Sequence, residues 1–496
     1  MTWIMLGADG ATGTRRHEIA HDDTHDAGPT LRAGWRFERG RLEVHGDRLG
    51  LIPLFWYRDA TRSIVADDIA ELVARIPHPR FDAAAVAVFL QLGFHVGEDT
   101  PFENVHVLAP GARLAFERGS LARDEPPVPV AERFGGTWAD ALPRYVELFE
   151  HAVARRARLG VGRLTVSGGR VSRHLFLELL RQGTPPPAVI TQDRPVNTDL
   201  DVGRRLASRA GIPHIAVAPF RDGLAEELQK NRWNHYLSDE NAWYVQIAPV
   251  LDGPLFDGLA GGMLSGTDMF EADRLNTVIG TGRATAAAQA LLGVMGSSLP
   301  YVSDRYRARW SRELAVERLA VELERHRHAP NPITSFLFWN RTRREVALIP
   351  LCIAARHVPV RLAYLDPELM AFLSSLPHPL FSGTGFHSHV IARTYPGFAD
   401  LPYGNKRRRP RSLRGTLAEC RAVLRFGLFS PAVQRRRCLR AMARGLLTAQ
   451  PQPVSGWLYR MLPLLQAAGD LGIELEDLAQ PAHGYSPRPQ KGLAAE

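Results

Sequence analysis

The chain has 496 residues, 45% of them apolar and 23% charged, which suffices for two to four domains with sizeable cores and excludes a wholly disordered chain. No apolar run reaches the roughly 18 residues that span a bilayer, and the N-terminus has no signal pattern, so we expect a cytoplasmic protein with no membrane partner. The formal net charge of +9 at pH 7 would attract a polyanionic partner.

Residues 1–125 alternate short apolar segments with turns. The first clear strand is predicted over residues 35–38, followed by a strand over 41–45 and by a turn and buried strand over 46–57. A helix is expected over 81–90 and a further strand over 112–116. This succession predicts an α+β domain.

Two runs in this region resemble the glutaminase domain of asparagine synthetases: G-D-x-L-G-x-x-P-L at residues 46–54 and T-x-F-E-x-V-x-x-L-x-P-G at 100–111. In that family a Cys directly after the initiator Met is an N-terminal nucleophile. Position 2 here is Thr2, and threonine can also be an N-terminal nucleophile when its own amine acts as the base. The Arg- and Asn-Gly-centred loops that bind glutamine in the family are missing. We therefore expect a truncated glutaminase-like (Ntn-type) domain that is a scaffold without glutaminase activity.

Residues 126–136, rich in Pro and Gly, form a predicted linker to a second domain over residues 137–480, and residues 481–496 have the composition of a flexible tail. An amphipathic helix is expected over 138–156. Predicted strands then alternate with predicted helices over residues 163–166, 172–181, 188–191, 199–210 and 214–218. This period is typical of parallel βαβ units, in which ligands bind at the carboxyl ends of the strands.

Ser167, Gly168 and Gly169 directly follow the first of these strands. A strand that breaks at paired glycines before a helix leaves backbone N–H groups pointing outward, which is how α/β proteins hold phosphates. Thr191 ends the next strand and is expected at the same edge of the sheet. These four residues are candidate nucleotide-binding residues.

This half resembles the synthetase domain of asparagine synthetases, a parallel-sheet α/β pyrophosphate-loop (adenine nucleotide α-hydrolase-like) fold shared with β-lactam synthetases and the macrolactam-forming cyclases of lasso peptides. The family motif S-G-G-x-D-S is matched at residues 167–172, and G-x-G-G-D-E-L-F-G-G is matched at 258–266. A weaker match lies between these two loops at 238–242, and two more follow at 340–344 and 360–369, ahead of C-terminal helices. The resemblance adds Ser172 and Gly261 to the candidate nucleotide-binding residues and identifies the chain as a degenerate member.

In that family ATP adenylates a carboxylate, an amine attacks the acyl-adenylate, and one Asp in each loop holds the Mg²⁺ that the leaving pyrophosphate needs. The matching positions here are Val171 and Gly262, and Met263 follows where the family has Glu. Loss of fixed metal placement slows adenylation by roughly 10³ or more. We predict no metal ligand at these positions. We also expect Val171 and Gly262 to face each other across one cleft, with Ser167 on its wall.

Charged residues near these loops leave alternatives open. Arg170 and Arg173 either replace part of the metal's charge, bind an anion without turnover, or point to solvent. Four acids either build a shifted metal site or act singly as helix caps and surface charges: Asp239, Glu240, Asp252 and Asp257.

Residues 405–440 carry twelve Lys or Arg and the single acid Glu419. Lys406 follows a Leu-Pro segment, like the family lysine that stabilises charge on the acyl-adenylate and pyrophosphate, so the resemblance makes it the candidate catalytic residue. It is also expected on the wall of the cleft, unless these cations are only a solvated run. Apolar residues interleave at near-helical spacing, which favours helices with solvated arginine faces over a nucleic-acid partner: Leu413, Leu417, Leu424, Phe426 and Phe429.

Other residues have structural expectations. Tyr364 and Asp366, in the matched segment 360–369, are expected to pack and to cap a helix. Cys352, Cys420 and Cys438 lack CxxC spacing and are expected to be reduced, buried thiols.

Two functions remain open from the sequence. The first is an ATP-dependent, AMP-forming amide ligase without glutaminase activity, which forms a macrolactam or another amide from a carboxylate-bearing small molecule or peptide. ATP would be its cofactor, with Mg²⁺ only if the site is active. The second is a non-catalytic protein that binds a peptide, a nucleotide or an active paralogous partner.

Overall fold

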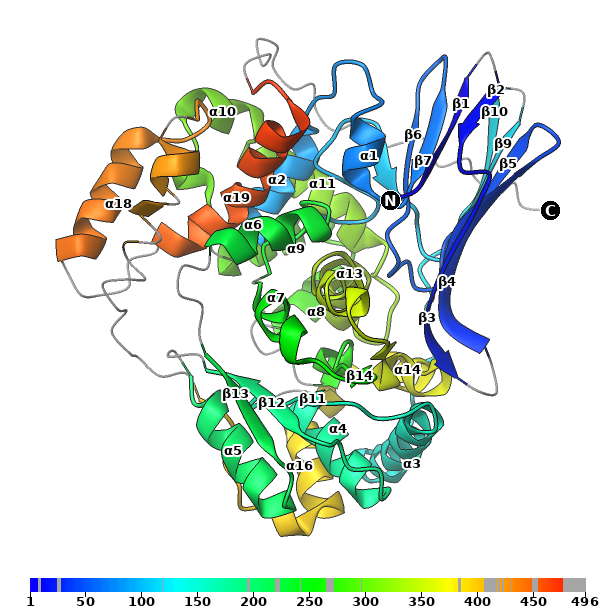
Figure 1. The fold of residues 1–496 in the computed structure, drawn as a ribbon, viewed down its shortest axis with the longest axis vertical. Helices are drawn as coiled ribbons and strands as arrows, with labels where there is room; N and C mark the ends of the chain where they lie inside the picture. The colour runs from blue at the N-terminus through cyan, green and yellow to red at the C-terminus, as the bar shows by residue number, and fades with distance from the viewer. Residues whose placement is uncertain are drawn as a thin grey trace.

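Figure 1 shows the computed structural model, which describes residues 1–475 except 8–9, 25–27, 118, 194–196, 219–223, 241, 265–271, 296, 382–384, 406–416, 418–419, 422, 429 and 448–453. The chain is a mixed α/β protein with several sheets and many helices. The predicted flexible tail, 481–496, lies outside the described residues. No helix in the described ranges combines the length and the apolar character needed to cross a membrane.

The N-terminal part is built from two five-stranded antiparallel sheets. One has the order β2-β1-β7-β6-β8, with bounds β1 Trp3–Gly7, β2 Gly10–Gly13, β6 Phe55–Arg58, β7 Ser63–Ala66 and β8 Val105–Val107. The other has the order β10-β9-β5-β4-β3, with bounds β3 Arg16–Thr24, β4 Gly28–Glu38, β5 Arg41–His45, β9 Arg113–Glu117 and β10 Ser120–Asp124.

Alternation of apolar residues sets the register of the second sheet. Leu42 pairs with Phe116, and Val44 pairs with both Leu114 and Trp35. All five side chains are buried, because every second residue of a strand points to the same face. The predicted strands over 35–38, 41–45 and 112–116 are confirmed.

One expectation for this part was wrong. Strands β1, β2 and β3 precede residue 35, where no clear strand was expected. Strand β3 is rich in His and Asp and is ordered through its pairing with β4. Residues 46–54 form a loop around the buried carboxylate of Asp47, which accepts hydrogen bonds from Leu49 N and Ile52 N. The buried strand β6 follows from Phe55, in agreement with the turn and buried strand predicted over 46–57.

Helices α1 (Ile69–Val73) and α2 (Ala83–Leu92) begin at Asp68 and Asp82, whose carboxylates accept hydrogen bonds from first-turn amides. The predicted helix over 81–90 corresponds to α2, which packs on α11 (Arg312–Glu324). Residues 126–136, the predicted linker, contain neither helix nor strand.

The second half contains a three-stranded parallel sheet of the order β11-β12-β13 (Leu164–Thr165, Val189–Gln192, His214–Val217) and a parallel pair, β14 (Leu255–Phe256) and β15 (Val360–Arg361). Helices α3 (Trp138–Ala157), α4 (Arg170–Arg181) and α5 (Asp199–Ala210) confirm the predicted alternation closely. Figure 1 shows β13, β12, β11 and β14 in that order across the lower part of the molecule.

The two parallel sheets adjoin at β11 and β14. Gly162 N donates to Pro254 O at 2.9 Å, and Arg163 N donates to Asp252 O at 2.8 Å. The chain therefore runs outward from β11 to β13 in one direction and from β14 to β15 in the other. A reversal of strand order creates a crevice at the carboxyl ends of the two central strands.

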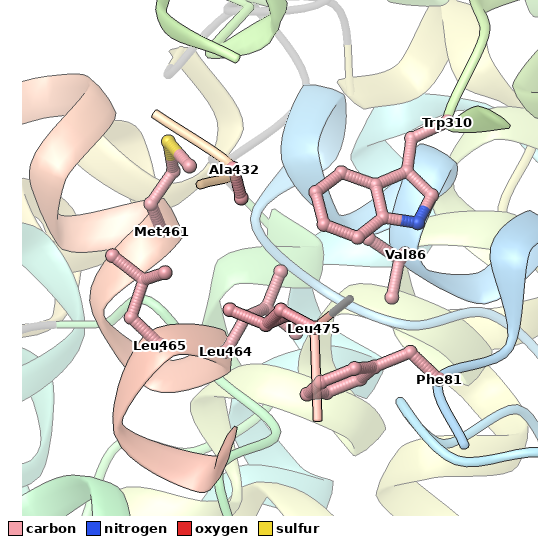
Figure 2. A pocket seen from close by; sticks show the side chains of 8 residues that line it. All are labelled: Phe81, Val86, Trp310, Ala432, Met461, Leu464, Leu465 and Leu475. Carbon is pink, nitrogen blue, oxygen red and sulfur yellow. The ribbon is translucent and has the colours of Figure 1, made fainter. Parts of the chain in front are cut away.

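Within the described residues, the other α- and π-helices are α6 (Leu224–Trp233), α7 (Trp243–Ile247), α8 (Ala272–Gly280), α9 (Ala284–Val294), α10 (Asp304–Arg309), α12 (Pro332–Leu337), the π-helix η5 (Phe338–Val346), α13 (Leu348–Cys352), α14 (Pro367–Ser375), α15 (His378–Phe381), α16 (Gly385–Thr394), the π-helix η9 (Val423–Gly427), α18 (Arg435–Leu447) and α19 (Val454–Leu471). Figure 2 shows a small hollow between α2 and α19, lined by Phe81, Val86, Trp310, Ala432, Met461, Leu464, Leu465 and Leu475. Its lining has no titratable group, so it is a gap in helix packing.

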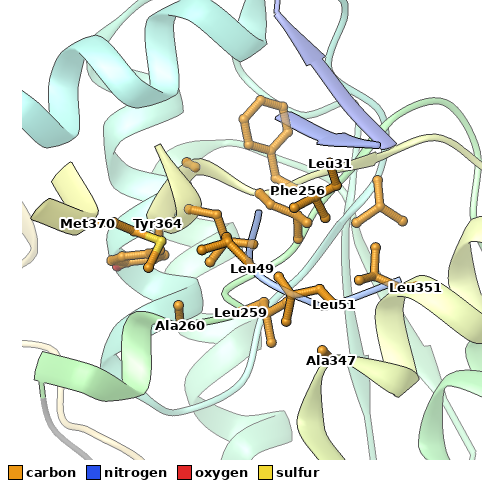
Figure 3. Close-up of a cluster of buried hydrophobic side chains, with 14 of the residues drawn as sticks. Leu31, Leu49, Leu51, Phe256, Leu259, Ala260, Ala347, Leu351, Tyr364 and Met370 are labelled. Atoms are coloured by element: carbon orange, nitrogen blue, oxygen red, sulfur yellow. The ribbon is translucent and has the colours of Figure 1, made fainter. Parts of the chain in front are cut away.

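One buried cluster joins the N-terminal sheets to the parallel sheet. Figure 3 shows Leu49 and Leu51, from the G-D-x-L-G-x-x-P-L run, in the same cluster as Phe256 and Leu259 at the end of β14. The run that resembles a glutaminase motif thus packs the two halves together. The three cysteines are buried and free, which confirms that expectation.

Candidate functional site

The candidate site lies where the loops after β11 and β14 meet. Residues 167–169, the Ser-Gly-Gly loop, follow β11 and lead into α4, and residues 257–262 follow β14. Gly169 is the N-cap of α4, and no side chain donates or accepts a capping hydrogen bond there. Because α4 has no acidic residue in its first turn, no carboxylate of that turn offsets the positive end of its dipole.

The backbone amides of the Ser-Gly-Gly loop are already engaged within the protein. Ser167 N donates to Ser172 Oγ at 3.0 Å, and Gly169 N donates to Ser167 Oγ at 3.1 Å. Gly168 N donates to Asp199 Oδ1 at 3.1 Å. A phosphate group would have to replace all three acceptors.

Asp199 was not expected at this site. It is the first residue of α5, and Asn197 Nδ2 donates to its other carboxylate oxygen at 2.7 Å. A carboxylate bound to the loop amide opposes a phosphate at the same place, because like charges in a partly buried site repel. The sequence signal was an acid opening the helix that follows the neighbouring strand.

A second segment of the chain covers the loop. Gly404 N donates to Gly168 O at 2.7 Å, and Asn405 N donates to Thr198 Oγ1 at 2.9 Å. A Cβ on Gly168 would lie only 2.6 Å from Gly404 Cα. The two glycines are therefore required for this contact, and we call residues 401–405 the covering segment.

Two arginines fix the covering segment. Arg173 is 1% exposed and donates to the carbonyl oxygens of Leu401 and Pro402. The guanidinium groups of Arg170 and Arg173 lie 4.2 and 4.1 Å from the ring centroid of Tyr403. For Arg173 the solvent-facing alternative was wrong, because its guanidinium is buried against this segment. Lys406 directly follows the segment but lies outside the described residues.

The loops after β11 and β14 meet, but the apolar side chain of Val171 fills the contact where a cleft between Val171 and Gly262 was expected. A Cβ on Gly258 would lie 2.4 Å from Val171 Cγ1, and one on Gly261 would lie 2.5 Å from the same atom. The ring of Tyr364 also approaches Gly261. Gly262, one residue further, is exposed, and a Cβ there would meet nothing within 4 Å.

Thr191 lies at the edge predicted for it, but its hydroxyl faces inward. It donates to Val166 O at 2.8 Å and lies 3.2 Å from His214 Nε2. The side chain is 3% exposed. The hydroxyl therefore ties β12 to β11.

The four acids considered for a shifted metal site have separate partners. Asp239 pairs with Arg460 at 2.9 Å, Asp252 with Arg163 at 3.6 Å, and Glu240 with Arg341 at 3.8 Å. Asp257 accepts from Tyr244 and from Leu259 N, and burial raises the pKa of its carboxyl. In the part of the chain that the structure describes, no three His, Cys, Asp or Glu residues are placed to hold a metal ion.

A buried polar network lies behind α4. His174 Nδ1 lies 3.1 Å from His387 Nε2 and 3.3 Å from the Tyr145 hydroxyl. Tyr395 donates to Glu178 at 2.5 Å. Burial lowers the pKa of His174 well below its ordinary value and lowers that of His387 to about 3. Two neutral histidines therefore support the helix that carries the Ser-Gly-Gly loop.

Asp366 takes the capping role expected of it. Its carboxylate accepts from Glu368 N at the start of α14 and pairs with Arg155 and Arg156. Although burial acts against ionisation, these two guanidinium groups hold the pKa of Asp366 below its usual value. Tyr364 is fully buried, as expected.

At the N-terminus, Thr2 N donates to Asp67 Oδ1 at 2.6 Å, and His17 Nε2 lies 3.0 Å from Asp67 Oδ2. Although burial acts against ionisation, these hydrogen bonds keep the pKa of Asp67 below its usual value. If Met1 were removed, the Thr2 amine would lie beside this carboxylate. A neighbouring carboxylate favours the protonated amine, which cannot act as a base.

Comparisons with known proteins do not place the chain in a family: no family model matches it, and a search of curated proteins finds no match.

Proposed function

We propose that this chain is a non-catalytic protein with the architecture of ATP-dependent, carboxylate-adenylating amide ligases of the asparagine-synthetase type. Support comes from the parallel sheet whose strand order reverses between β11 and β14, and from the Ser-Gly-Gly loop that follows β11 at that reversal. In this proposal the N-terminal sheets correspond to a glutaminase-like (Ntn-type) domain and the second half to a pyrophosphate-loop domain. Both assignments rest on the motifs and their order.

The packing of Val171 carries the proposal. Its methyl groups contact Gly258 and Gly261 at the position where the resemblance requires a carboxylate for Mg²⁺. Magnesium needs oxygen ligands and keeps several water molecules, and valine supplies neither an oxygen nor space for water. The residues present do not fit the metal, so we derive no adenylation step.

The Ser-Gly-Gly loop supports the same conclusion independently. Its three amides donate to Ser172, Ser167 and Asp199, and the covering segment lies against Gly168. Binding of ATP phosphates would require these contacts to break and the Asp199 carboxylate to leave. The role that fits these contacts is recognition of a peptide or of an active paralogous partner.

Pyrophosphate release tests this proposal. The full chain is incubated with ATP, Mg²⁺ and a panel of carboxylate and amine substrates, and pyrophosphate is measured by a coupled assay. We expect no release above a protein-free control. Magnesium-dependent release that Ser167→Ala abolishes would contradict the proposal, because only turnover at this loop would respond in that way.

An AMP-forming amide ligase is the second candidate function. One observation favours it: Gly169 leaves the N-terminus of α4 without a side-chain cap, and Ser167 beside it is exposed. Uncapped helix N-termini attract anions. If this candidate is correct, ATP turnover appears in the same assay with the substrate supplying the amine.

A further inference from the structure

Helix α18 (Arg435–Leu447) lies at the outer edge of the molecule (Figure 1). Its inner side is apolar, with Cys438 and Met442 0% and 9% exposed. Its outer side is unusual, because large apolar residues lie there with the charged ones. Leu439 is 48% exposed and Leu447 is 85% exposed.

The leucines and arginines form adjacent rows. Residues four apart in a helix lie on one side, so Leu439 and Leu447 share a row, and Arg436 and Arg440 form the row beside it. Arg435, Arg436 and Arg440 are exposed. Within the described residues, none of these three arginines has a carboxylate within ion-pair distance.

The neighbouring π-helix η9 extends this surface. It contacts α18 and presents Leu424, which is 44% exposed, and Arg425. Residues 420–447 contain seven arginines and no Asp or Glu. The arginines of this surface are exposed, as expected of helices with solvated arginine faces, but Leu417 and Leu424 are exposed beside them.

We propose that the outer face of α18 and η9, the basic-leucine face, docks on an anionic phospholipid surface. Guanidinium groups pair with lipid phosphates and attract acidic headgroups, while neighbouring leucines enter the boundary with the acyl chains. A protruding helix suits a flat bilayer surface. A nucleic-acid backbone would satisfy the arginines alone and leave the leucines in water.

This attachment is peripheral, because no helix in the described ranges has the length and apolar character to cross a bilayer. It revises the expectation of no membrane partner, which rested on the lack of a spanning segment. The inference does not depend on whether the site near Ser167 is catalytic.

Vesicle sedimentation tests the proposal. The full chain is mixed with vesicles of phosphatidylcholine alone or with about 30% phosphatidylserine. We expect binding to the anionic vesicles that weakens as salt rises. Arg436→Ser with Arg440→Ser should weaken partitioning about thirtyfold, and Leu439→Ser with Leu447→Ser roughly tenfold. The control, Arg204→Ser with Arg205→Ser on the exposed side of α5, removes the same charge and should change nothing.

Three outcomes would overturn the proposal. The first is no binding to anionic vesicles at low salt. The second is an equal loss in the Arg204 and Arg205 control, which would indicate a general charge effect. The third is binding to a DNA duplex that is as tight as binding to vesicles and insensitive to the leucine substitutions, which would indicate a nucleic-acid surface. Circular dichroism of each variant ensures that a loss of binding is not a loss of fold.

Discussion

The contact between Gly168 and Gly404 gives the sharpest structural prediction. A Cβ added at Gly168 would lie 2.6 Å from Gly404 Cα and 2.7 Å from Asp199 Oδ1. Gly168 does not have the positive φ that makes glycine necessary on backbone grounds. Gly168→Ala therefore tests steric contact alone.

Overpacking against backbone that cannot move aside costs about 1–3 kcal/mol. The cheapest response is displacement of the covering segment, which breaks the hydrogen bonds from Gly404 N to Gly168 O and from Asn405 N to Thr198 Oγ1. We expect Gly168→Ala to lower the free energy of unfolding by about 1–3 kcal/mol. We also expect amide hydrogen exchange at residues 404 and 405 to accelerate.

Urea unfolding and hydrogen exchange measured by mass spectrometry provide the two readouts. The matched control is Gly262→Ala in the opposite loop, where the added Cβ would meet nothing within 4 Å. Peptides from α3 report whether any faster exchange is global. The Gly168→Ala variant could have the same free energy of unfolding as the unmodified chain and the same amide exchange rates at residues 404 and 405. That result would contradict the packing of the covering segment on Gly168.

Three further predictions concern charges. Asp199→Asn removes the negative charge at the Gly168 amide, so pyrophosphate binding measured by calorimetry should tighten about tenfold. Burial lowers the pKa of His387 to about 3, below the unfolded value of about 6.5. The unfolded state therefore binds the extra proton as pH falls from 6.5 towards 3, and stability drops. The free energy of unfolding, measured with urea, should therefore fall between pH 7 and pH 5. His387→Leu should make that fall smaller by up to about 2 kcal/mol. Asp366→Ala leaves Arg156 buried without this carboxylate and should cost about 3 kcal/mol in the same measurement.

Each charge prediction has a matched control. Asp201→Asn, in the same turn of α5, should not alter pyrophosphate binding. His389→Leu, on an exposed position of α16, should leave the pH dependence unchanged. Glu368→Ala, whose carboxylate is 64% exposed, should cost less than about 1 kcal/mol. If a control substitution changes the measured quantity as much as its test variant does, the role assigned to the test residue is contradicted.

The parallel sheet was predictable because its signals are local. The boundaries of α3, α4, α5, β12 and β13 follow from apolar periodicity and from stops such as Gly211. The meeting of the loops after β11 and β14 followed from the motifs. Strand β3 was missed because it is stabilised by pairing with β4 rather than by its own residues.

The hydrogen-bond partners of the Ser-Gly-Gly loop and of Arg173 were not predictable in the same way. Asp199 lies 31 residues from Gly168 in the chain, and the partners of Arg173 lie 228 and 229 residues away. Such contacts depend on the packing of whole elements, so no local pattern contains them. Thr191 illustrates the same limit: its position at the strand end was predicted, but the inward direction of its hydroxyl depends on Val166 and His214.

Metal binding tests the central claim most directly. Electron paramagnetic resonance of Mn²⁺ with ATP distinguishes the free complex from one held by protein. We predict that the full chain leaves the Mn²⁺·ATP spectrum unchanged, because in the proposed architecture Val171 packs at the position of the metal-binding carboxylate. A protein-bound Mn²⁺·ATP signal from the unmodified chain, lost in Ser167→Ala, would contradict the account.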